Sequence, residues 1–244
     1  MNALNTLKRI INNENLIIEN ANIDADYRGE IHIGLENYSD LLSNSAFLQA
    51  AKNTATFSLM AVPLAVVLSL VMAMILEQNI PMKSYFRTFF LSPMMVPVAS
   101  VVLIWQVLFD YHGVINEWIL FFGGTSVDWF KSGYSQIVIV ILFLWKNLGY
   151  NMILFMSALS NIPKDQLEAA EVDGATELQA FWKIKWPQMM PTTLYILVIT
   201  TINSFQCFAL IQLLTSGGPN NSTMTIMYYI YYNAFKLYKY GYGN

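Results

Sequence analysis

The sequence feature that most restricts the possible folds of this chain is a set of long segments without a charged side chain. Residues 53–76, 88–109 and 191–235 contain no Asp, Glu, Lys or Arg. Apolar segments of this length exceed the core helices of water-soluble domains and fit helices that cross a bilayer. Charged residues make up 12% of the chain, about half of the roughly 25% usual in soluble domains. We therefore expect an all-α fold, a polytopic transmembrane helix bundle.

The apolar segments predict four membrane spans, over residues 54–76, 88–109, 136–159 and 192–214. The first would be about 34 Å long at 1.5 Å per residue, which is enough to cross about 30 Å of hydrocarbon. The second contains Pro93 and Pro97 near its start, so we expect its first turns to be irregular. The polar residues 1–53 lack the apolar core of a signal peptide. We expect them to lie outside the cell membrane, before a transmembrane domain over residues 54–244.

Basic residues in the loops predict the orientation of these spans. The segments 77–87 and 160–191 together carry five Lys and Arg, whereas the opposite loops carry three. The positive-inside rule therefore favours a cytoplasmic position for the first two segments. On the other side, residues 115–122 predict a short interfacial helix that ends at Gly123-Gly124. The aromatic residues 228–240 predict a second interfacial helix, because tyrosine favours the headgroup level.

Composition also excludes several kinds of site. The net charge is −3 without a basic stripe, which argues against nucleic-acid binding. His32 and His112 have no nearby Cys or second His, so we expect no metal site. No G-x-x-x-x-G-K-[ST] segment occurs, so we expect ATP to be hydrolysed by another chain and no cofactor to bind here.

A membrane enzyme and a secondary transporter both need residue types that are rare in these spans. A membrane enzyme needs paired carboxylates, a histidine ligand set or a nucleophile beside a base. The spans offer Lys146, Cys207 and tyrosines as ionisable groups, so no catalytic residue is predicted. A secondary transporter needs acidic residues or broken helices near the middle of the membrane. Pro63, Pro93 and Pro97 are the only residues of the spans that favour a secondary transporter. This alternative stays open.

Residues 162–191 separate two spans and predict a helix–turn–helix hairpin. Pro163 suits a first helical turn, where Asp165 and Glu168 meet the positive end of the helix dipole. Asp173-Gly174 then breaks this helix, because glycine accepts the backbone angles of a sharp turn.

A second helix is predicted directly after the turn. Thr176 and Gln179 have the spacing of a capping box, and Pro187 is expected to end the helix. An ordinary cytoplasmic hairpin packed on its own protein fits this pattern as well as a docking surface for a partner does.

The hairpin resembles a known motif. Glu168-Ala169-Ala170, Asp173-Gly174-Ala175 and then Phe181, Ile184 and Pro187 resemble the EAA loop of binding-protein-dependent ABC importer permeases. Trp186 departs from the leucine usual before this proline. Further matches resemble the maltose and glycerol-phosphate branch of the family: Gly34 to Tyr38, Asn53-Thr54, Trp145 with Gly149, Ile162-Pro163, Leu214 to Pro219 and Tyr240-Gly241-Tyr242.

The resemblance implies a role for each hairpin residue. Glu168 would be the polar contact to a separate ATPase, Ala169 and Ala170 would permit close docking, and Gly174 would make the turn. Asp173 and Pro187 complete the motif. The implied system is a sugar importer of the bacterial inner membrane, with ATP-binding subunits, a second permease subunit and an external solute-binding protein. Such permeases usually have six spans, so four predicted spans suggest that the first and last are missing.

Polar side chains in the last span mark a candidate solute pathway. Asn203 and Gln206 lie three residues apart and share a helix face. Polar groups inside a membrane are costly and tend to line cavities, although they also join helices by hydrogen bonds. The resemblance favours the pathway, to which we add Phe205 for its aromatic ring and Lys146 for its charge. The alternative for Lys146 is a side chain whose apolar stem lies along the helix while its ammonium group reaches water.

Overall fold

The computed structural model describes residues 23–25, 31–33, 36–78 and 81–238. The sequence matches at residues 34–35 and 240–242 lie outside these ranges. Strands β1 (Ile23–Ala25) and β2 (Ile31–Ile33) pair antiparallel, with Asp24 opposite His32. The remaining elements are helical: α2 (Glu36–Ser43), α3 (Ser45–Glu77), α4 (Lys83–Met95), α5 (Val98–Leu108), α6 (Val114–Phe121), α7 (Ser135–Ser160), α8 (Lys164–Val172), α9 (Glu177–Ala180), the π-helical turn η1 (Phe181–Lys185), α10 (Trp186–Phe205), α11 (Ala209–Leu214), α12 (Ile226–Tyr231) and the π-helical turn η2 (Tyr232–Lys236).

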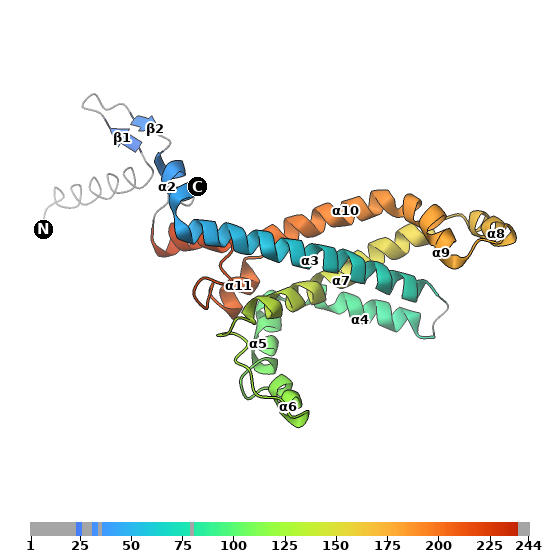
Figure 1. Ribbon diagram of the computed structural model, residues 1–244, viewed down its shortest axis with the longest axis horizontal. Helices are drawn as coiled ribbons and strands as arrows, with labels where there is room; N and C mark the ends of the chain where they lie inside the picture. Colours follow the sequence, from blue (N-terminus) through green and yellow to red (C-terminus); the bar gives the residue numbers. More distant parts are fainter. Residues whose placement is uncertain (1–22, 26–30, 34–35, 79–80, 239–244) are drawn as a thin grey trace, which may run out of the picture.

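Three long helices, α3, α7 and α10, run side by side and form the body of the molecule (Figure 1). By length and composition, three helical segments of the described chain suffice to cross a membrane, or four if α4 and α5 count as one span. Buried apolar side chains form two clusters along this body. One cluster lies near α11 and α12, and the other joins the halves of α3, α7 and α10 next to α8.

The first predicted span is the central part of α3, which begins earlier than expected. The side chain of Asn44 accepts a hydrogen bond from the backbone N–H of Ala46 at 2.9 Å and so caps the helix at Ser45. Pro63 lies inside the helix without ending it. Neighbouring helices tolerate such a proline where they pack against the freed backbone.

The second predicted span is divided between two helices, and the irregular backbone expected near Pro97 is a complete break between them. The axes of α4 and α5 differ in direction by 103°. Pro97, the residue before α5, has no N–H to continue α4, and a residue that precedes proline is pushed towards extended backbone. Val96 has the extended angles φ −81° and ψ 132°. The two helices therefore meet at a sharp bend.

The third predicted span agrees closely with α7, whereas the fourth predicted span differs from α10 at both ends. Helix α10 begins at Trp186, ends at Phe205 and is followed by the separate short helix α11. In between, the backbone N–H of Phe208 donates to the carbonyl of Gln206 at 2.7 Å. This tight turn interrupts the helix within the predicted segment.

Glycine makes one close helix contact possible in this bundle. A Cβ atom at Gly149 of α7 would overlap the backbone carbonyl of Phe90 in α4. The two helices therefore touch backbone to backbone at this point. Further out, Trp105 of α5 packs against Trp145 of α7, with ring centroids 5.8 Å apart. Both halves of the bent pair are thus held on α7.

The two interfacial helices expected from the sequence exist as helices. Helix α6 matches residues 115–122 within one residue, and Gly123 ends it at φ 80°. In the aromatic segment, α12 and η2 form, but Tyr228 and Tyr229 are buried against the bundle. Tyr228 stacks on Phe208 with ring centroids 6.2 Å apart. This segment is therefore partly core.

Candidate functional site

The turn between α8 and α9 has the hydrogen bonds of a Schellman cap. Gly174 adopts φ +77°, and its N–H donates to the carbonyl of Glu171 at 3.0 Å. The N–H of Ala175 donates to the carbonyl of Ala170 at 2.9 Å. A Cβ atom at Gly174 would meet nothing within 4 Å. The backbone angle, rather than crowding, is what calls for glycine here.

The capping box predicted for the second helix is present. The Thr176 hydroxyl accepts from the Gln179 N–H at 3.3 Å, and the Gln179 side chain accepts from the Thr176 N–H at 2.9 Å. This reciprocal pair fixes the start of α9 directly after the Gly174 turn.

Pro187 does not end the second helix, so that prediction is wrong. The chain passes from α9 through η1 into α10 without leaving helical backbone angles. In the π-helical turn the Trp186 N–H donates to the carbonyl of Phe181, five residues back. Pro187 follows directly, where the π-helical turn already replaces the regular i to i−4 hydrogen-bond pattern, so the missing N–H does not end the helix. The hairpin is therefore joined to α10 by a continuous rod.

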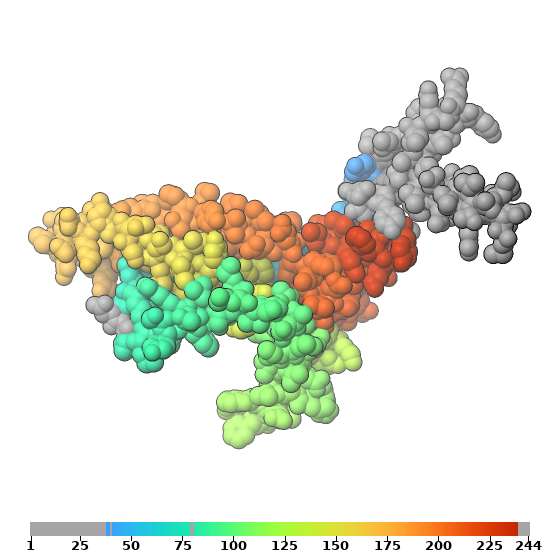
Figure 2. Space-filling view, turned by 180° about the vertical axis from the view of Figure 1, so that it is seen from behind, coloured from blue at the N-terminus to red at the C-terminus, as the bar shows by residue number. Residues whose placement is uncertain are grey.

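The hairpin, defined here as α8, α9 and η1, has an exposed tip. No residue from Pro163 to Gln188 is buried. Three apolar side chains are largely exposed: Val172 at 88%, Leu178 at 68% and Trp182 at 57%. Figures 1 and 2 show the hairpin projecting beyond the ends of the long helices. Among the predicted coupling residues, Ala170 is half-buried and the others are exposed: Glu168, Ala169, Asp173, Gly174 and Pro187.

The base of the hairpin packs on the bundle. Ile162 is buried, and four half-buried apolar residues contact the same core cluster: Leu167, Phe181, Ile184 and Trp186. Gln188 donates to Gln166 at 2.6 Å across the hairpin. Lys185 lies 3.8 Å from the carboxylate of Glu77 at the end of α3. The base therefore packs on its own protein while the tip is uncovered, and docking of a partner on the tip stays a prediction.

Polar contacts join the long helices around the candidate pathway residues. Asn203 of α10 donates to the side-chain oxygen of Asn147 in α7 at 3.1 Å. One helical turn away, Asn151 donates to the hydroxyl of Thr200 at 3.1 Å, and this pair is buried. The second pair is not among the candidate pathway residues predicted from the sequence. The i, i+4 spacing of the two asparagines on α7 was the available signal.

The candidate pathway residues differ in exposure and position. Asn203 and Phe205 lie in the last turn of α10, Gln206 follows directly after it, and all three are exposed. Lys146 lies next to Asn147 on α7 and is half-buried. The Asn147–Asn203 hydrogen bond brings these two groups of residues together. On the opposite side of α10, Ser204 is buried and shares a hydrogen bond of 2.8 Å with Ser58 of α3. One face of α10 therefore holds the bundle and another face is open.

At the end of the molecule opposite the hairpin, residues 215–225 form a loop that we call the external loop. Asn53 of α3 donates to the carbonyls of Asn221 at 2.7 Å and Met224 at 2.9 Å. Within the loop, the hydroxyls of Thr215 and Thr223 lie 2.7 Å apart. These contacts hold the Gly217-Gly218-Pro219 turn on the bundle. They give Asn53, which in the sequence is only a match to the family, a structural role.

Comparison with known proteins identifies the family. Residues 50–238 match the family described as binding-protein-dependent transport system inner membrane component. The sn-glycerol-3-phosphate transport system permease protein UgpA of Agrobacterium fabrum is 32% identical over 205 residues, which cover 83% of this chain and 70% of UgpA. The multiple sugar-binding transport system permease protein MsmF of Streptococcus mutans is 32% identical over 214 residues, which cover 87% of this chain and 73% of MsmF.

A solved structure shares the fold. The crystal structure of a bacterial ABC transporter for import of the acidic polysaccharide alginate superposes with a TM-score of 0.76 at 24% sequence identity. The match covers 87% of this chain and 76% of the other chain. This chain belongs to the binding-protein-dependent transport-system inner-membrane components, and is thus a permease of an ABC importer rather than an enzyme.

Proposed function

We propose that this chain carries a sugar or sugar-derived solute across the bacterial inner membrane, and that its α8–α9 hairpin is the contact for a separate ATPase. The observation that carries the proposal is the combination of an exposed hairpin tip with a base packed on the long helices. The solute class is supported by relatives named for glycerol-3-phosphate and multiple-sugar transport.

The hairpin has the surface and the connections that coupling requires. Exposed Val172, Leu178 and Trp182 offer apolar area to a partner. Glu168 and the small Ala169 lie exposed on α8 beside them. Since α9, η1 and α10 form one helical rod, a displacement of the tip is transmitted to α10 as a rigid-body motion. The bundle then changes its arrangement without any covalent link to the motor subunit.

The proposed solute pathway lies at the exposed end of α10. Sugars are bound by amide donors and acceptors together with aromatic faces. Asn203 and Gln206 supply amides, Phe205 supplies a ring, and Lys146 adds a positive charge near Asn147. A second permease subunit would complete the pathway from the other side. The external loop, at the end opposite the hairpin, is the proposed contact for the solute-binding protein.

A pair of acidic-to-alanine variants tests the hairpin assignment. Glu168→Ala removes a carboxylate from the hairpin, and Glu117→Ala removes one from α6, which lies away from the hairpin (Figure 1). The complete importer is expressed with each variant and purified by a tag on the ATPase. We expect Glu168→Ala to lose the co-purified permease, or the solute-stimulated ATPase activity, while its amount in the membrane stays unchanged. Glu117→Ala should resemble the wild type in both measurements.

Gly174 provides a second test of the same proposal. Gly174→Ala adds a methyl group with free space around it but opposes the left-handed backbone, so it alters the turn without crowding it. We expect reduced coupling of ATP hydrolysis to solute uptake in proteoliposomes. Wild-type ATPase recovery and uptake with both Glu168→Ala and Gly174→Ala would refute the hairpin as the coupling element.

A further inference from the structure

The π-helical turn η1 decides in which direction the hairpin points away from α10. In this turn the Trp186 N–H donates to the carbonyl of Phe181, five residues back, whereas an α-helix pairs residues four apart. The turn therefore holds one residue more than an α-helical turn. One residue of an α-helix corresponds to a rotation of about 100° around the axis. The hairpin tip thus points well away from the direction that an uninterrupted α-helix would give it.

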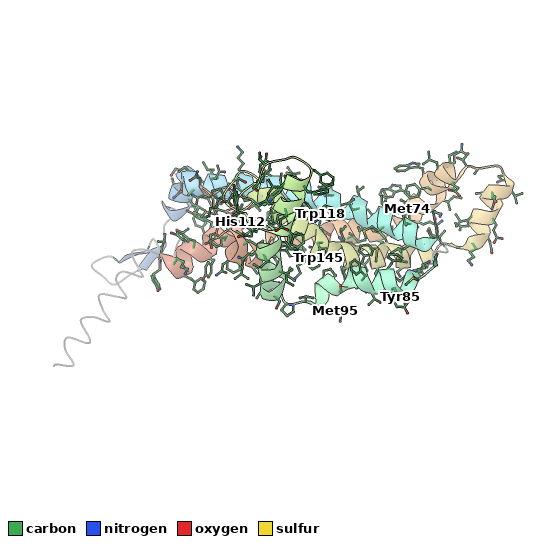
Figure 3. All side chains as sticks on the ribbon, turned by 90° about the horizontal axis from the view of Figure 1, so that it is seen from below. Met74, Tyr85, Met95, His112, Trp118 and Trp145 are labelled. Carbon is green, nitrogen blue, oxygen red and sulfur yellow. The ribbon has the colours of Figure 1, made fainter. Side chains whose placement is uncertain are left out.

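Packing of two aromatic rings favours this register. Phe181 and Trp186 both contact the core cluster at the hairpin end of the bundle, and their ring centroids lie 6.2 Å apart. Met74 of α3 contacts the same cluster, and Figure 3 shows it at the end of the bundle from which the hairpin extends. In an α-helix, side chains five residues apart point about 140° away from each other. The π-helical turn instead brings both rings onto one face.

Pro187 weakens the competing α-helical register. In a regular helix, residue 187 would donate its N–H to the carbonyl of Lys183, four residues back. Proline has no N–H to donate, and its ring collides with that carbonyl. Pro191, one turn further on, lies inside regular α-helix, so proline alone does not make a π-helical turn. At Pro187 the loss in the α-helical register and the ring packing in the π-helical register act together.

The direction of α8 depends on this rod. Helix α8 has no buried residue. Its contacts to the rest of the chain include Leu167, which is half-buried against the core cluster, and the hydrogen bond of 2.6 Å from Gln188 to Gln166. A rotation of the rod before Trp186 would therefore carry the exposed side of α8, with Glu168, to a new position.

We infer that Pro187 is a positioning residue, which sets the direction of the hairpin by favouring the π-helical register of η1. This inference rests on the proposed function, because it takes the hairpin as the contact for the ATPase. Pro187 acts through Phe181–Lys185 and needs no contact of its own with the ATPase. Without this proline, the N–H of residue 187 donates to the carbonyl of Lys183, and the α-helical register becomes populated. The hairpin then takes a second direction, which misplaces Glu168.

Distances between two spin labels measure the direction of the hairpin. One label is attached at Val172→Cys, at the exposed end of α8, and the other at Leu59→Cys, exposed on α3. Cys207 is replaced by Ala, and the complete importer is measured in lipid nanodiscs. We expect one distance with Pro187 present. Pro187→Ala should add a second distance and lower the solute-stimulated ATPase activity, while the amount of permease in the membrane stays unchanged.

A compensating deletion shows whether the register is the cause. Deletion of the exposed Lys183 from the Pro187→Ala variant leaves four residues where η1 has five. A regular α-helical turn then holds the hairpin in its original direction. We expect this double variant to return to the single wild-type distance and to regain ATPase activity. Pro191→Ala removes a proline from the regular part of the same helix, and as the matched control it should keep the single distance.

Two results would overturn the inference. One is an unchanged single distance in Pro187→Ala, and the other is a second distance that persists after deletion of Lys183. In both cases co-purification of the ATPase with the wild-type chain leaves the proposed function standing. A second distance together with wild-type ATPase activity would instead refute the hairpin as the ATPase contact, which is the proposed function, and with it the positioning role of Pro187.

Discussion

The hairpin and the external loop are both connections at the ends of long helices, yet they are held in opposite ways. In the hairpin, every residue from Pro163 to Gln188 is at least partly exposed, and apolar packing at its base attaches it. In the external loop, Thr223, Met224 and Thr225 are buried, and side chains of α3 and α7 bond its backbone. The segment that we propose as the partner contact stays open, whereas the other segment completes the core.

This difference predicts that substitutions in the external loop lower stability, whereas substitutions in the hairpin alter partner contacts. The largest effect is expected from Asn53→Ala. It removes both hydrogen bonds to the loop carbonyls. The Met224 carbonyl then loses its partner in a buried place, whereas the Asn221 carbonyl keeps the Met224 N–H as a donor at 3.2 Å. The expected loss is about 3 kcal/mol, or roughly 8 °C in the unfolding temperature of a chain of this size.

Thermal unfolding of the purified chain in detergent measures the effect of Asn53→Ala. Asn161→Ala, exposed at the end of α7, is the matched control and should leave the unfolding temperature unchanged. Equal unfolding temperatures for the two variants would contradict the structural role given to Asn53.

A matched pair of glycines sharpens the comparison. Gly174 and Gly217 adopt nearly the same φ, +77° and +81°. A Cβ atom at Gly217 would lie 2.9 Å from the Tyr228 ring, whereas one at Gly174 would meet nothing within 4 Å. Gly217→Ala should therefore cost about 2 kcal/mol and Gly174→Ala about 1 kcal/mol. The same unfolding measurement checks the order, and a reversed order would show that the external loop is the looser segment.

A smaller and local effect is expected at the capping box. Thr176→Ala removes the acceptor for the Gln179 N–H and should destabilise the start of α9 by about 1 kcal/mol. Because this turn is exposed, the loss should appear as faster hydrogen exchange of residues 177–180 without a change in overall unfolding temperature. Thr56→Ala, an exposed threonine on α3, serves as the control. Unchanged exchange at these amides would mean that packing, not the cap, holds α9.

The smallest effect is expected from the ion pair at the base of the hairpin. Lys185 and Glu77 are 3.8 Å apart and both partly exposed, and such pairs contribute at most about 0.5 kcal/mol. Lys185→Gln should therefore leave the unfolding temperature within about 2 °C of the wild type. A larger loss that disappears in high salt would show that charge, rather than the apolar contacts of Phe181 and Ile184, attaches the hairpin.

Local signals in the sequence were sufficient for most of the helices and for the hairpin turn. The Thr176–Gln179 capping box, the Gly174 turn and the extent of α7 follow from residues close together in the chain. The consequences of proline were harder to predict. Pro97 breaks a helix whereas Pro187 is accommodated, and the difference depends on the π-helical turn before Pro187. Such a turn has no short sequence signature, because it depends on packing against the bundle.

The membrane bundle, its family and the hairpin could be predicted from the residues alone, because charge-free helix-length segments and turn residues act locally. Which polar side chains meet and which surfaces stay open depends on how the helices pack. Asn53 reaches Met224, 171 residues further along the chain, and no local preference encodes such a contact. The direction of the α4–α5 bend was likewise decided by the contact of Phe90 with Gly149 and of Trp105 with Trp145, since helix ends leave the angle free and side-chain packing sets it.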